Sequence, residues 1–262
     1  MPELPEVEVQ LRYLKRAALG QAIERVIIRF PGIIKSPHAR AFAIALRRRR
    51  MVKASRRGKY IIITLDNGRV LILHFGMGGG LCLFDDRRER PEYARIEFVL
   101  ESGKRLAFTC PRNICRVMLV DKPGDVPALR DMGAEPLARG FTLAYLERVI
   151  DESPSRRIKP LLMDQRRIAG VGNIYADQIL FEAGVRPDRR ASTLSEHEIK
   201  CTHRETRRVL RRAIATAGED EFPAYFLASR AGRREGCPRC GGEILRKKLN
   251  GRTAHFCRRC QQ

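Results

Sequence analysis

The stretch Pro2-Glu3-Leu4-Pro5-Glu6-Val7, directly behind Met1, decides how the N-terminal half of this chain is organised. Pro and Glu are favoured in the first turn of a helix, where a proline lacks only an unneeded backbone donor and a carboxylate complements the helix dipole. Apolar residues then recur with a helical period from 7 to 19. They are Val7, Leu11, Leu14 and Ala18, and the period stops at Gly20. The pattern predicts an N-terminal helix that holds the beginning of the chain in place.

The same stretch carries groups that could act as a nucleophile and as proton carriers. Removal of Met1, which a small second residue permits, would leave Pro2 as a terminal secondary amine. A free α-amine titrates near pH ~7.7–8, so a useful fraction is an unprotonated nucleophile at neutral pH. Such an amine can attack an electrophilic sugar carbon and end as an iminium. Glu3 and Glu6 lie within one helical turn and can move protons. The alternative is that these residues only start a helix.

Charge and length limit the kind of protein. A chain of 262 residues can build a sizeable core and indicates two domains. Lys and Arg number 52 against 30 Asp and Glu, giving a net charge of +22 and an isoelectric point near 10.5. This imbalance favours a polyanionic partner, because each neutralised phosphate releases counterions. With no apolar run of about 18 residues and no signal peptide before Pro2, we expect a soluble cytoplasmic protein with no membrane partner.

The apolar pattern between 23 and 120 is that of strands. Candidate strands are 26–28, 60–63, 70–73, 96–100 and 117–120. Two polar stretches with glycine, Asp66-Asn67-Gly68 and Glu101-Ser102-Gly103, lie between such runs and predict hairpin turns. We therefore expect a β-sandwich or barrel with the first helix in front of it.

A stretch rich in Pro, Gly and Asp, 123–136, is the predicted linker, and helical periods return beyond it. Candidate helices are 142–152, 158–164, 173–183 and 195–217. The predicted fold class is α+β. The predicted domains are 1–122 with the helix and the sandwich, 137–236 with the later helices, and 237–262.

Two close pairs of cysteines define the last of these domains. Cys237-Pro238-Arg239-Cys240 and Cys257-Arg258-Arg259-Cys260 are separated by sixteen residues, and each turn offers two sulfurs to one tetrahedral ion. Four thiolates leave no open position for water, so the spacing predicts one structural Zn²⁺ ion. Between the pairs, 244–249 and 253–256 predict strands joined at Asn250-Gly251, which places Arg252 at a hairpin tip.

The remaining cysteines are scattered through the chain, which suits a reducing compartment and thiols that are not part of a disulfide framework. They are Cys82, Cys110, Cys115 and Cys201.

Three further stretches place glycine next to polar residues. Arg57-Gly58-Lys59-Tyr60 begins a predicted strand, and His74-Phe75-Gly76-Met77-Gly78-Gly79 follows one. Gly170-Val171-Gly172-Asn173 opens a predicted helix, whose free amides attract phosphate. Each stretch also has an alternative without a functional role. A lone lysine such as Lys59 is usually solvated, and a Gly-x-Gly such as 170–172 usually marks a turn.

The N-terminal residues Pro2 to Glu8 resemble the amino terminus of the formamidopyrimidine-DNA glycosylases, and the similarity extends over essentially all 262 residues. The related endonuclease VIII typically has Gly where Leu4 stands. The resemblance implies a helix–two-turn–helix element between 161 and 179 and a zinc ribbon at 237–262. It also implies a nucleoid-associated, monomeric enzyme whose partner is double-stranded DNA with damaged bases or abasic sites.

The same resemblance implies a base-excision-repair DNA glycosylase that is also an abasic-site lyase. Pro2 would form a Schiff base with the damaged deoxyribose while Glu3 supplies protons. Lys59 and Arg252 would assist β,δ-elimination. Glu6 would orient the site or relay protons, with packing at the start of the helix as an equal alternative.

Residues predicted to touch DNA come from several of these stretches. Met77 and Arg112 would fill the space that an extruded nucleotide leaves, since an opened duplex needs an apolar plug and a cation. Lys159 and Asn173 match family residues that contact DNA. The full predicted set is His74, Met77, Arg112, Asn113, Ile114, Lys159, Asn173 and Tyr175.

The chain also departs from the family pattern in two places. In the second loop, Ile114 stands where Phe is usual, Asn113 where Arg is usual and Cys110 where Asp is common. The passage 218–237 is shorter than the family region that closes over an extruded 8-oxoguanine. Two alternatives therefore stay open: an enzyme acting on oxidised pyrimidines or abasic sites, as endonuclease VIII does, and a damaged-DNA-binding protein without catalysis.

Overall fold

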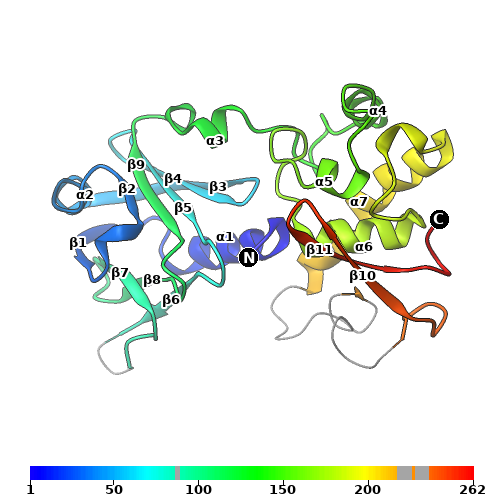
Figure 1. Ribbon diagram of the computed structural model, residues 1–262. Coiled ribbons are helices and arrows are strands. Elements are labelled where there is room, and N and C mark those ends of the chain that lie inside the picture. The colour runs from blue at the N-terminus through cyan, green and yellow to red at the C-terminus, as the bar shows by residue number, and fades with distance from the viewer. Residues whose placement is uncertain (86–88, 217–225, 228–235) are drawn as a thin grey trace. The chain divides into compact units, whose positions relative to one another are not determined.

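The computed structural model describes residues 1–85, 89–216, 226–227 and 236–262 (Figure 1). The chain divides into two compact units, Met1–Asp131 and Met132–Gln262. Among the described residues, no helix combines the length and the apolar character that crossing a membrane requires. The four predicted segments of the chain, including the linker at 123–136, stay a prediction.

The first unit begins with helix α1 (Leu4–Ala17), which is followed by a sheet of nine described strands. The strands are β1 (Ala22–Ile28), β2 (Ile34–Ser36), β3 (Arg49–Arg57), β4 (Tyr60–Leu65), β5 (Val70–His74), β6 (Gly80–Phe84), β7 (Ala94–Leu100), β8 (Arg105–Thr109) and β9 (Arg116–Val120). Shorter helices are η1 (Pro31–Ile33), α2 (Ala39–Leu46), η2 (Pro123–Asp125) and α3 (Pro127–Arg130). The hydrogen-bonded order of the strands is β2-β9-β5-β4-β3-β1-β7-β8-β6, and β2 pairs with β9 in parallel.

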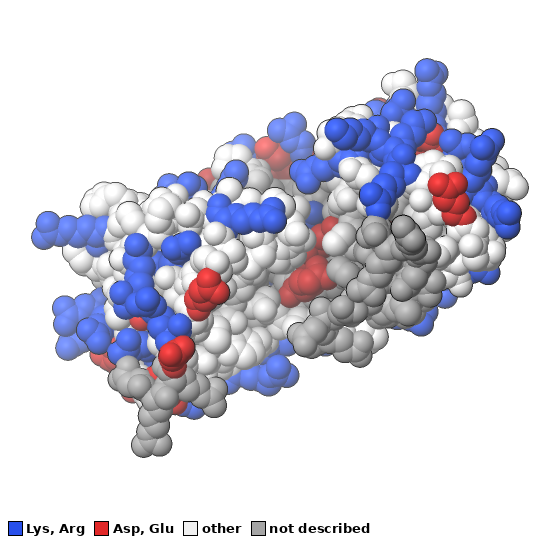
Figure 2. Space-filling model, turned by 60° about the horizontal axis from the view of Figure 1, so that its bottom comes forward, with Lys and Arg blue, Asp and Glu red and all other residues white. Residues whose placement is uncertain are grey.

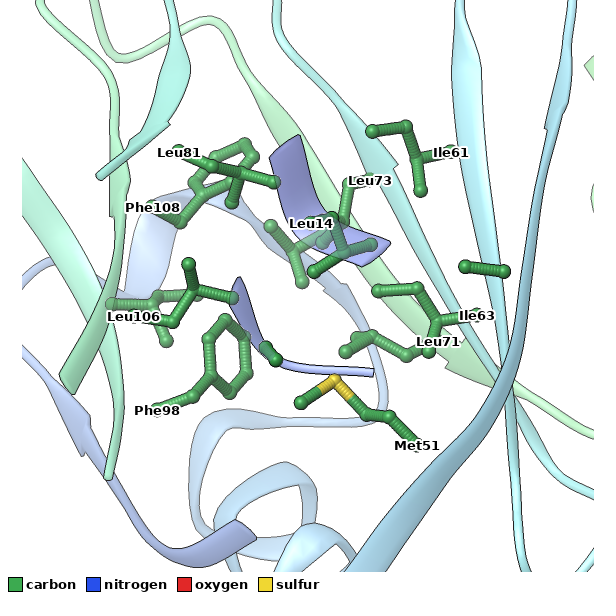
Figure 3. Packing of buried hydrophobic residues seen from close by; sticks show 14 of the residues in the cluster. Leu14, Met51, Ile61, Ile63, Leu71, Leu73, Leu81, Phe98, Leu106 and Phe108 are labelled. Carbon is green, nitrogen blue, oxygen red and sulfur yellow. The ribbon is translucent and has the colours of Figure 1, made fainter. Parts of the chain in front are cut away.

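The sheet folds over itself around one apolar core (Figure 3). On one side lie the inward residues of β4 and β5, such as Ile63 and Leu73, and on the other lie Phe98 of β7 and Phe108 of β8. Leu14 of α1 packs between the two sides and is fully buried. Burial of a leucine stabilises the fold by ~1.5–3 kcal/mol, so this contact anchors α1 to the sandwich. The predicted sandwich with a helix in front is confirmed.

The second unit is helical and ends in a two-stranded hairpin. Its elements are α4 (Leu143–Asp151), α5 (Ile158–Leu162), α6 (Asn173–Ala183), η3 (Ala191–Thr193), α7 (Glu196–Thr216), β10 (Ile244–Leu249) and β11 (Arg252–Cys257). Helix α6 is buried on most sides and packs against α7 and β11. The chain leaves it through Gly184, whose φ of 74° is left-handed. The α+β class, the helical region and the C-terminal hairpin are as predicted.

Helix α1 begins at Leu4, so the first turn predicted in the Pro2–Val7 stretch and the apolar period from 7 belong to one helix, which Glu3 caps. One expectation needs correction. Cys110 and Cys115 are not scattered thiols: they form a disulfide with Cα atoms 6.1 Å apart. The sequence alone does not show this pair, because the bond forms only when the loop between the two cysteines brings its ends together.

Candidate active site and metal centre

The start of α1 fixes the residues next to Pro2. Glu3 is the N-terminal cap and is buried, with extended backbone angles. Its side chain accepts from the backbone of Glu6, and its own backbone N–H donates to Glu6 Oε2 over 2.7 Å. This reciprocal capping box gives Glu6 a defined role in holding the helix start. Pro2 is thus attached directly to a residue whose backbone and side chain are both immobilised.

The turn that carries Lys59 is tied to the same helix. Gly58 and Lys59 form the two-residue turn between β3 and β4, and Gly58 has a φ of 54°. Arg56 donates to Gly58 O over 3.1 Å and to Glu8 Oε2 of α1 over 3.0 Å. Lys59 itself is buried, at 6% exposure. The α1 start and the lysine turn are therefore held together within the first unit.

His74 at the end of β5 is held in its neutral form. Its ring lies 4.6 Å from the Tyr60 ring, and its Nδ1 accepts from Gly76 N over 3.4 Å. Burial, followed by the charges of Arg116 and Lys59, lowers the pKa of His74 to about 4. An acceptor Nδ1 places the proton on Nε2, so His74 can offer a hydrogen bond but no positive charge near neutral pH.

The lowered pKa of His74 predicts a specific loss of stability in acid. The unfolded chain binds the proton near pH ~6.5 and the folded chain only near about 4, so stability falls as pH drops through this window and is constant above it. His74→Gln should remove up to about 3 kcal/mol of this loss. Urea unfolding at pH 7 and pH 4.5 tests it. If the free energy of unfolding of wild type and of His74→Gln falls equally between pH 7 and pH 4.5, the pKa of His74 is not lowered in the folded protein.

The loops after β5 and after β8 meet, and they bring two predicted DNA-contact residues together. Arg112 Nη1 lies 3.7 Å from Met77 Sδ. A Cβ on Gly76 would come within 2.9 Å of the carbonyl oxygen of Ile114, so only glycine allows the two backbones to approach this closely. Met77 is 38% exposed and Ile114 is 50% exposed, which is unusual for large apolar side chains. The two loops thus present an apolar tip with a guanidinium beside it.

Asn113 occupies the turn of the second loop with a φ of 55°. Asparagine tolerates this left-handed conformation better than most residues, because its short polar side chain bonds locally. The departure from Arg at this position therefore has a backbone reason as well as a consequence for charge.

Lys159 on α5 lies inside the second unit rather than on its surface. It is 1% exposed, and its Nζ lies 2.8 Å from Asp177 Oδ1 of α6 and donates to Thr253 O of β11 over 2.8 Å. Asp177 Oδ2 accepts from His255 N of the same strand over 3.1 Å. The pair fastens the hairpin to the two helices. Its predicted contact with DNA stays a prediction.

Asp177→Asn should destabilise the second unit, because it leaves the Lys159 charge buried without its counter-ion. Removal of one partner of a buried pair typically costs ~3–5 kcal/mol. The free energy of unfolding, measured by urea denaturation, is expected to fall by about that amount. A matched control is Glu152→Gln, whose ion pairs with Arg148 and Arg167 are exposed and should contribute below ~1 kcal/mol. Equal effects in the two variants would contradict the argument.

Asn173 and Tyr175 both lie in the first turn of α6 but face different surroundings. The amide oxygen of Asn173 is buried and has no hydrogen-bond partner among the described residues. Tyr175 is almost fully buried and meets the Phe226 ring edge-on at 6.0 Å between centroids. Asn173 is therefore the better placed of the two for a ligand at the helix start, and Tyr175 supports the packing beneath it.

The hairpin tip brings Arg252 next to a hollow of about 240 Å³ that Lys159 also lines. Asn250 and Gly251 form the turn, with φ of 47° and 74°, and Leu249 pairs with Arg252 across it. Arg252 is exposed. Lys and Arg side chains are also spread over the visible face in Figure 2, which matches the net charge of +22.

Four thiols at the base of the hairpin form a cluster that suits a metal. The sulfurs of Cys237, Cys240, Cys257 and Cys260 all lie within 4.8 Å of one another. A backbone N–H from Gly242 lowers the pKa of Cys240 to about 7, whereas burial raises the pKa of Cys260 to about 12. Four adjacent thiolates therefore need a cation to balance them, and a tetrahedral sulfur set is the donor set that Zn²⁺ prefers.

The sequence of this chain is similar to known proteins over its whole length. Three family models match the chain: the formamidopyrimidine-DNA glycosylase N-terminal domain at 1–117, the H2TH domain of the same enzymes at 132–221, and a zinc finger found in FPG and IleRS at 235–262. A formamidopyrimidine-DNA glycosylase of Thermus thermophilus is 39% identical over 277 residues, covering 100% of this chain and 98% of that protein.

Solved structures of the same family have the same fold as this chain. The chain is similar to Lactococcus lactis Fpg in complex with abasic-site DNA, with a TM-score of 0.88 and 28% identity over 99% of both chains. The L. lactis Fpg complex with Fapy-dG DNA gives a TM-score of 0.87 at 28% identity, covering 99% of this chain and 100% of that chain.

The two units and the metal centre are those of a base-excision-repair DNA glycosylase with a zinc finger. The chain belongs to the formamidopyrimidine-DNA glycosylase family, whose function includes abasic-site lyase activity. The predicted zinc ion is confirmed by the matching finger and by the cluster of four cysteines. The roles of individual residues in catalysis and DNA binding stay predictions.

Proposed function

We propose that this enzyme excises oxidised or ring-opened bases through a covalent intermediate on Pro2. The observation that carries the proposal is the attachment of Pro2 to the capped, buried Glu3, with the Lys59 turn tied to the same helix through Glu8. A nucleophile needs a fixed position and a nearby proton carrier more than it needs strong basicity. The capped helix start and the buried Glu3 support both requirements within the first unit.

The reaction begins at the anomeric carbon of an extruded nucleotide. The Pro2 nitrogen forms a bond to that carbon, the bond to the base breaks, and the base leaves with a proton from solvent. The proton of the Pro2 N–H passes to the Glu3 carboxylate. The sugar ring then opens as its oxygen takes this proton from Glu3, which leaves an iminium cation. The cation acidifies the neighbouring sugar hydrogen, so loss of this proton expels the 3′ phosphate and a second elimination expels the 5′ phosphate. Lys59 and Arg252 act at these elimination steps, and water then frees Pro2.

Met77, Arg112 and Ile114 occupy the stack while the nucleotide is out. The exposed apolar tip and the adjacent guanidinium support this role, since unstacking costs a few kcal/mol that an inserted wedge offsets. His74, Asn113 and Asn173 complete the proposed DNA-binding set. Lys159 and Tyr175, whose side chains are buried, belong to it by supporting the hairpin and the start of α6. Because Asn113 carries no charge and Ile114 is not aromatic, we expect a different preference for the opposite base than in relatives with Arg and Phe there.

The lesion is proposed from the DNA that solved structures of relatives contain. L. lactis Fpg is described with abasic-site DNA and with Fapy-dG DNA, and we propose both as substrates here. Excision of oxidised pyrimidines is the second candidate, favoured by the altered second loop. The short passage 218–237, which would decide how an extruded base is covered, lies largely outside the described residues. A panel of duplexes with single lesions separates these substrates.

The covalent step is tested by borohydride reduction on abasic-site DNA. Protein whose mass shows that Met1 is absent should give an adduct on a denaturing gel, and peptide mapping should place the DNA on Pro2. Protein that retains Met1 should give none. An adduct on any other residue, or full activity with Met1 in place, would exclude the mechanism.

We further propose that the enzyme acts as a monomer on cytoplasmic, nucleoid DNA. The positive net charge supports association with DNA, and the presence of all proposed catalytic and metal residues in one chain supports the monomer. Light scattering with and without duplex DNA tests the second point: a dimer at working concentration would exclude it.

A further inference from the structure

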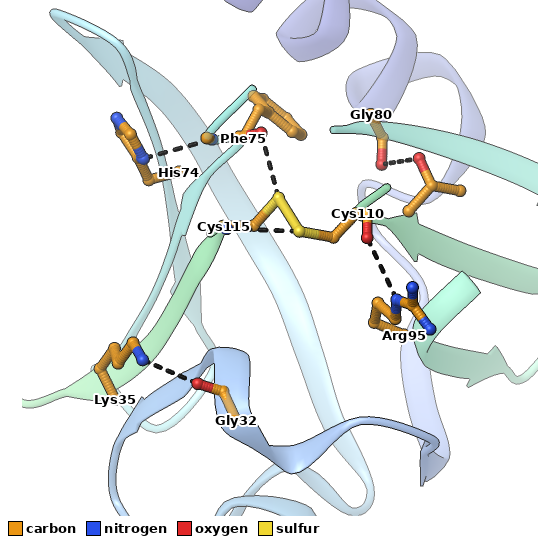
Figure 4. The surroundings of a disulfide bond; sticks show 10 residues. Gly32, Lys35, His74, Phe75, Gly80, Arg95, Cys110 and Cys115 are labelled. Carbon is orange, nitrogen blue, oxygen red and sulfur yellow. Dashed lines mark hydrogen bonds between the residues drawn. A yellow bond between two sulfur atoms is a disulfide. The ribbon is translucent and has the colours of Figure 1, made fainter. Parts of the chain in front are cut away.

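The disulfide Cys110–Cys115 closes a short ring around the loop that carries Arg112 and Ile114 (Figure 4). Cys110 follows β8 and Cys115 precedes β9, so the bond joins the two ends of the loop. Both cysteines are buried, at 0% and 1% exposure, while the loop between them is exposed. The bond therefore limits the motion of the exposed tip from beneath.

The cysteine pair also touches the other loop of the stack-filling tip. Cys115 Sγ lies 3.1 Å from Phe75 O, two residues before Met77, and a Cβ on Gly79 would come within 2.9 Å of the same sulfur. In the reduced form a Cys115 thiol at this place can donate to the Phe75 carbonyl. The backbone N–H of Cys115 lies 3.3 Å from Cys110 Sγ. Both the dithiol and the disulfide thus fit the same surroundings.

The other cysteines have different situations. Four belong to the zinc cluster in the second unit, and Cys82 and Cys201 are free. Cys110 and Cys115 are the pair that lies beside residues proposed to enter DNA. A change in this pair therefore reaches the tip without disturbing the metal centre.

We propose that Cys110 and Cys115 form a reversible redox site that controls the stiffness of the 110–115 loop, and this inference rests on the proposed role of Arg112 and Ile114. Hydrogen peroxide is the oxidant, and it reaches the buried sulfurs when the exposed loop between them opens. One thiol is then oxidised to a sulfenic acid with release of water, and the second thiol attacks that sulfur and releases another water. The two sulfurs lose two electrons, and the peroxide O–O bond accepts them. A dithiol reductant reverses the reaction by exchange.

The disulfide form of the 110–115 loop is better prepared to insert Arg112 and Ile114 into the base stack of a duplex. A tied loop has lost most of its freedom before it meets DNA, so less ordering remains to be done on binding. In a reducing compartment the dithiol form prevails. Peroxide, which also oxidises bases, would then close the loop and raise the activity of the enzyme when its substrates form.

The first part of the test maps the bond in the full-length, zinc-loaded protein. Free thiols are blocked by alkylation after treatment with peroxide or with dithiothreitol, and zinc content is measured in each sample. Trypsin cleaves after Arg105, Arg112 and Arg116, so Cys110 and Cys115 fall on separate peptides, 106–112 and 113–116. We expect these peptides to be joined in the peroxide sample and separate in the dithiothreitol sample. Separate alkylated peptides in both samples would overturn the proposal.

The second part measures the adduct trapped with cyanoborohydride, which reduces the iminium but leaves disulfides intact, using subsaturating enzyme on two DNAs. On a lesion-containing duplex, the oxidised protein should react about tenfold faster than the reduced protein, the size expected when one or two loop side chains must be ordered. On single-stranded abasic DNA, which has no stack to fill, the two forms should react equally. A merely structural disulfide would change both DNAs alike, and that result also counts against the proposal.

Variants and controls separate the possible failures. The double variant C110A/C115A should react like reduced wild type and should ignore peroxide, whereas Cys82→Ala should keep the full redox response. The wild-type comparison does not depend on the folding of any variant. Equal adduct from both redox forms on duplex would overturn the redox proposal alone. Complete absence of adduct on both DNAs in both forms would instead overturn the proposed function of Pro2.

Discussion

Pro2→Gly is expected to lower turnover on lesion-containing duplex by at least ~100-fold while the dissociation constant for that DNA changes less than about threefold. Glycine still permits loss of Met1, so a terminal amine remains. A secondary amine, however, can form only a charged iminium, whereas a primary amine forms an imine that is largely neutral until it is protonated. The sugar hydrogens are then less acidic, and both eliminations slow. Glycine also lacks the proline ring, so the terminal nitrogen is no longer held in one position.

Pro5→Ala provides the matched control for this prediction. Pro5 lies in the same first turn of α1 and is buried, but its nitrogen is inside the chain and cannot react. Single-turnover kinetics and an equilibrium binding measurement on the same duplex give the two quantities. A Pro2→Gly enzyme with wild-type turnover would remove Pro2 from the mechanism. A Pro5→Ala enzyme as slow as Pro2→Gly would show that the loss comes from the helix start and not from the amine.

Much of the fold could be predicted because many of its elements are apolar segments that stand between clear helix-start or turn signals. The helix at 173–183 matches α6 to the residue, and strands such as 70–73 stand between clear turns. Strand β3, Arg49–Arg57, was missed because basic residues occupy five of its nine positions and conceal its alternation. Strands β6 and β8 were missed because each has few β-branched residues. Periodicity finds elements that bury one continuous face, and these do not.

The candidate site was predictable where chemistry depends on spacing and not where it depends on tertiary contacts. Two Cys-x-x-Cys turns identify a zinc site in any context, since the ligand geometry is local. The burial of Lys159 against Asp177 could not be read from the sequence, because the partner lies on another helix. The Cys110–Cys115 bond was overlooked for a related reason: it depends on how a loop returns to the sheet.

Cys257→Ser should abolish zinc binding and lower the affinity for duplex DNA by about 100-fold. The hairpin β10–β11 is a two-stranded sheet, which is marginal in water without further support, and structural zinc contributes ~10–16 kcal/mol to small finger domains. Loss of the ion therefore releases the strand that carries Arg252, and with it the Thr253 carbonyl that accepts from Lys159. Lys159 then keeps its ion pair with Asp177 but loses the hydrogen bond to Thr253 O, so the packing of α5 and α6 is also destabilised.

Metal analysis and a binding titration measure the two effects of Cys257→Ser, and Cys201→Ser serves as the control because Cys201 is a buried thiol of the same unit outside the metal cluster. The control should retain one zinc per chain and wild-type affinity. Because the Pro2 chemistry is attributed to the first unit, the zinc-free variant should still give borohydride adduct on abasic-site DNA at concentrations high enough to bind it. A variant that lacks zinc and yet binds duplex normally would mean that the hairpin makes no useful contact. A variant that binds duplex but forms no adduct would mean that the zinc domain completes the reaction centre as well as the DNA-binding surface.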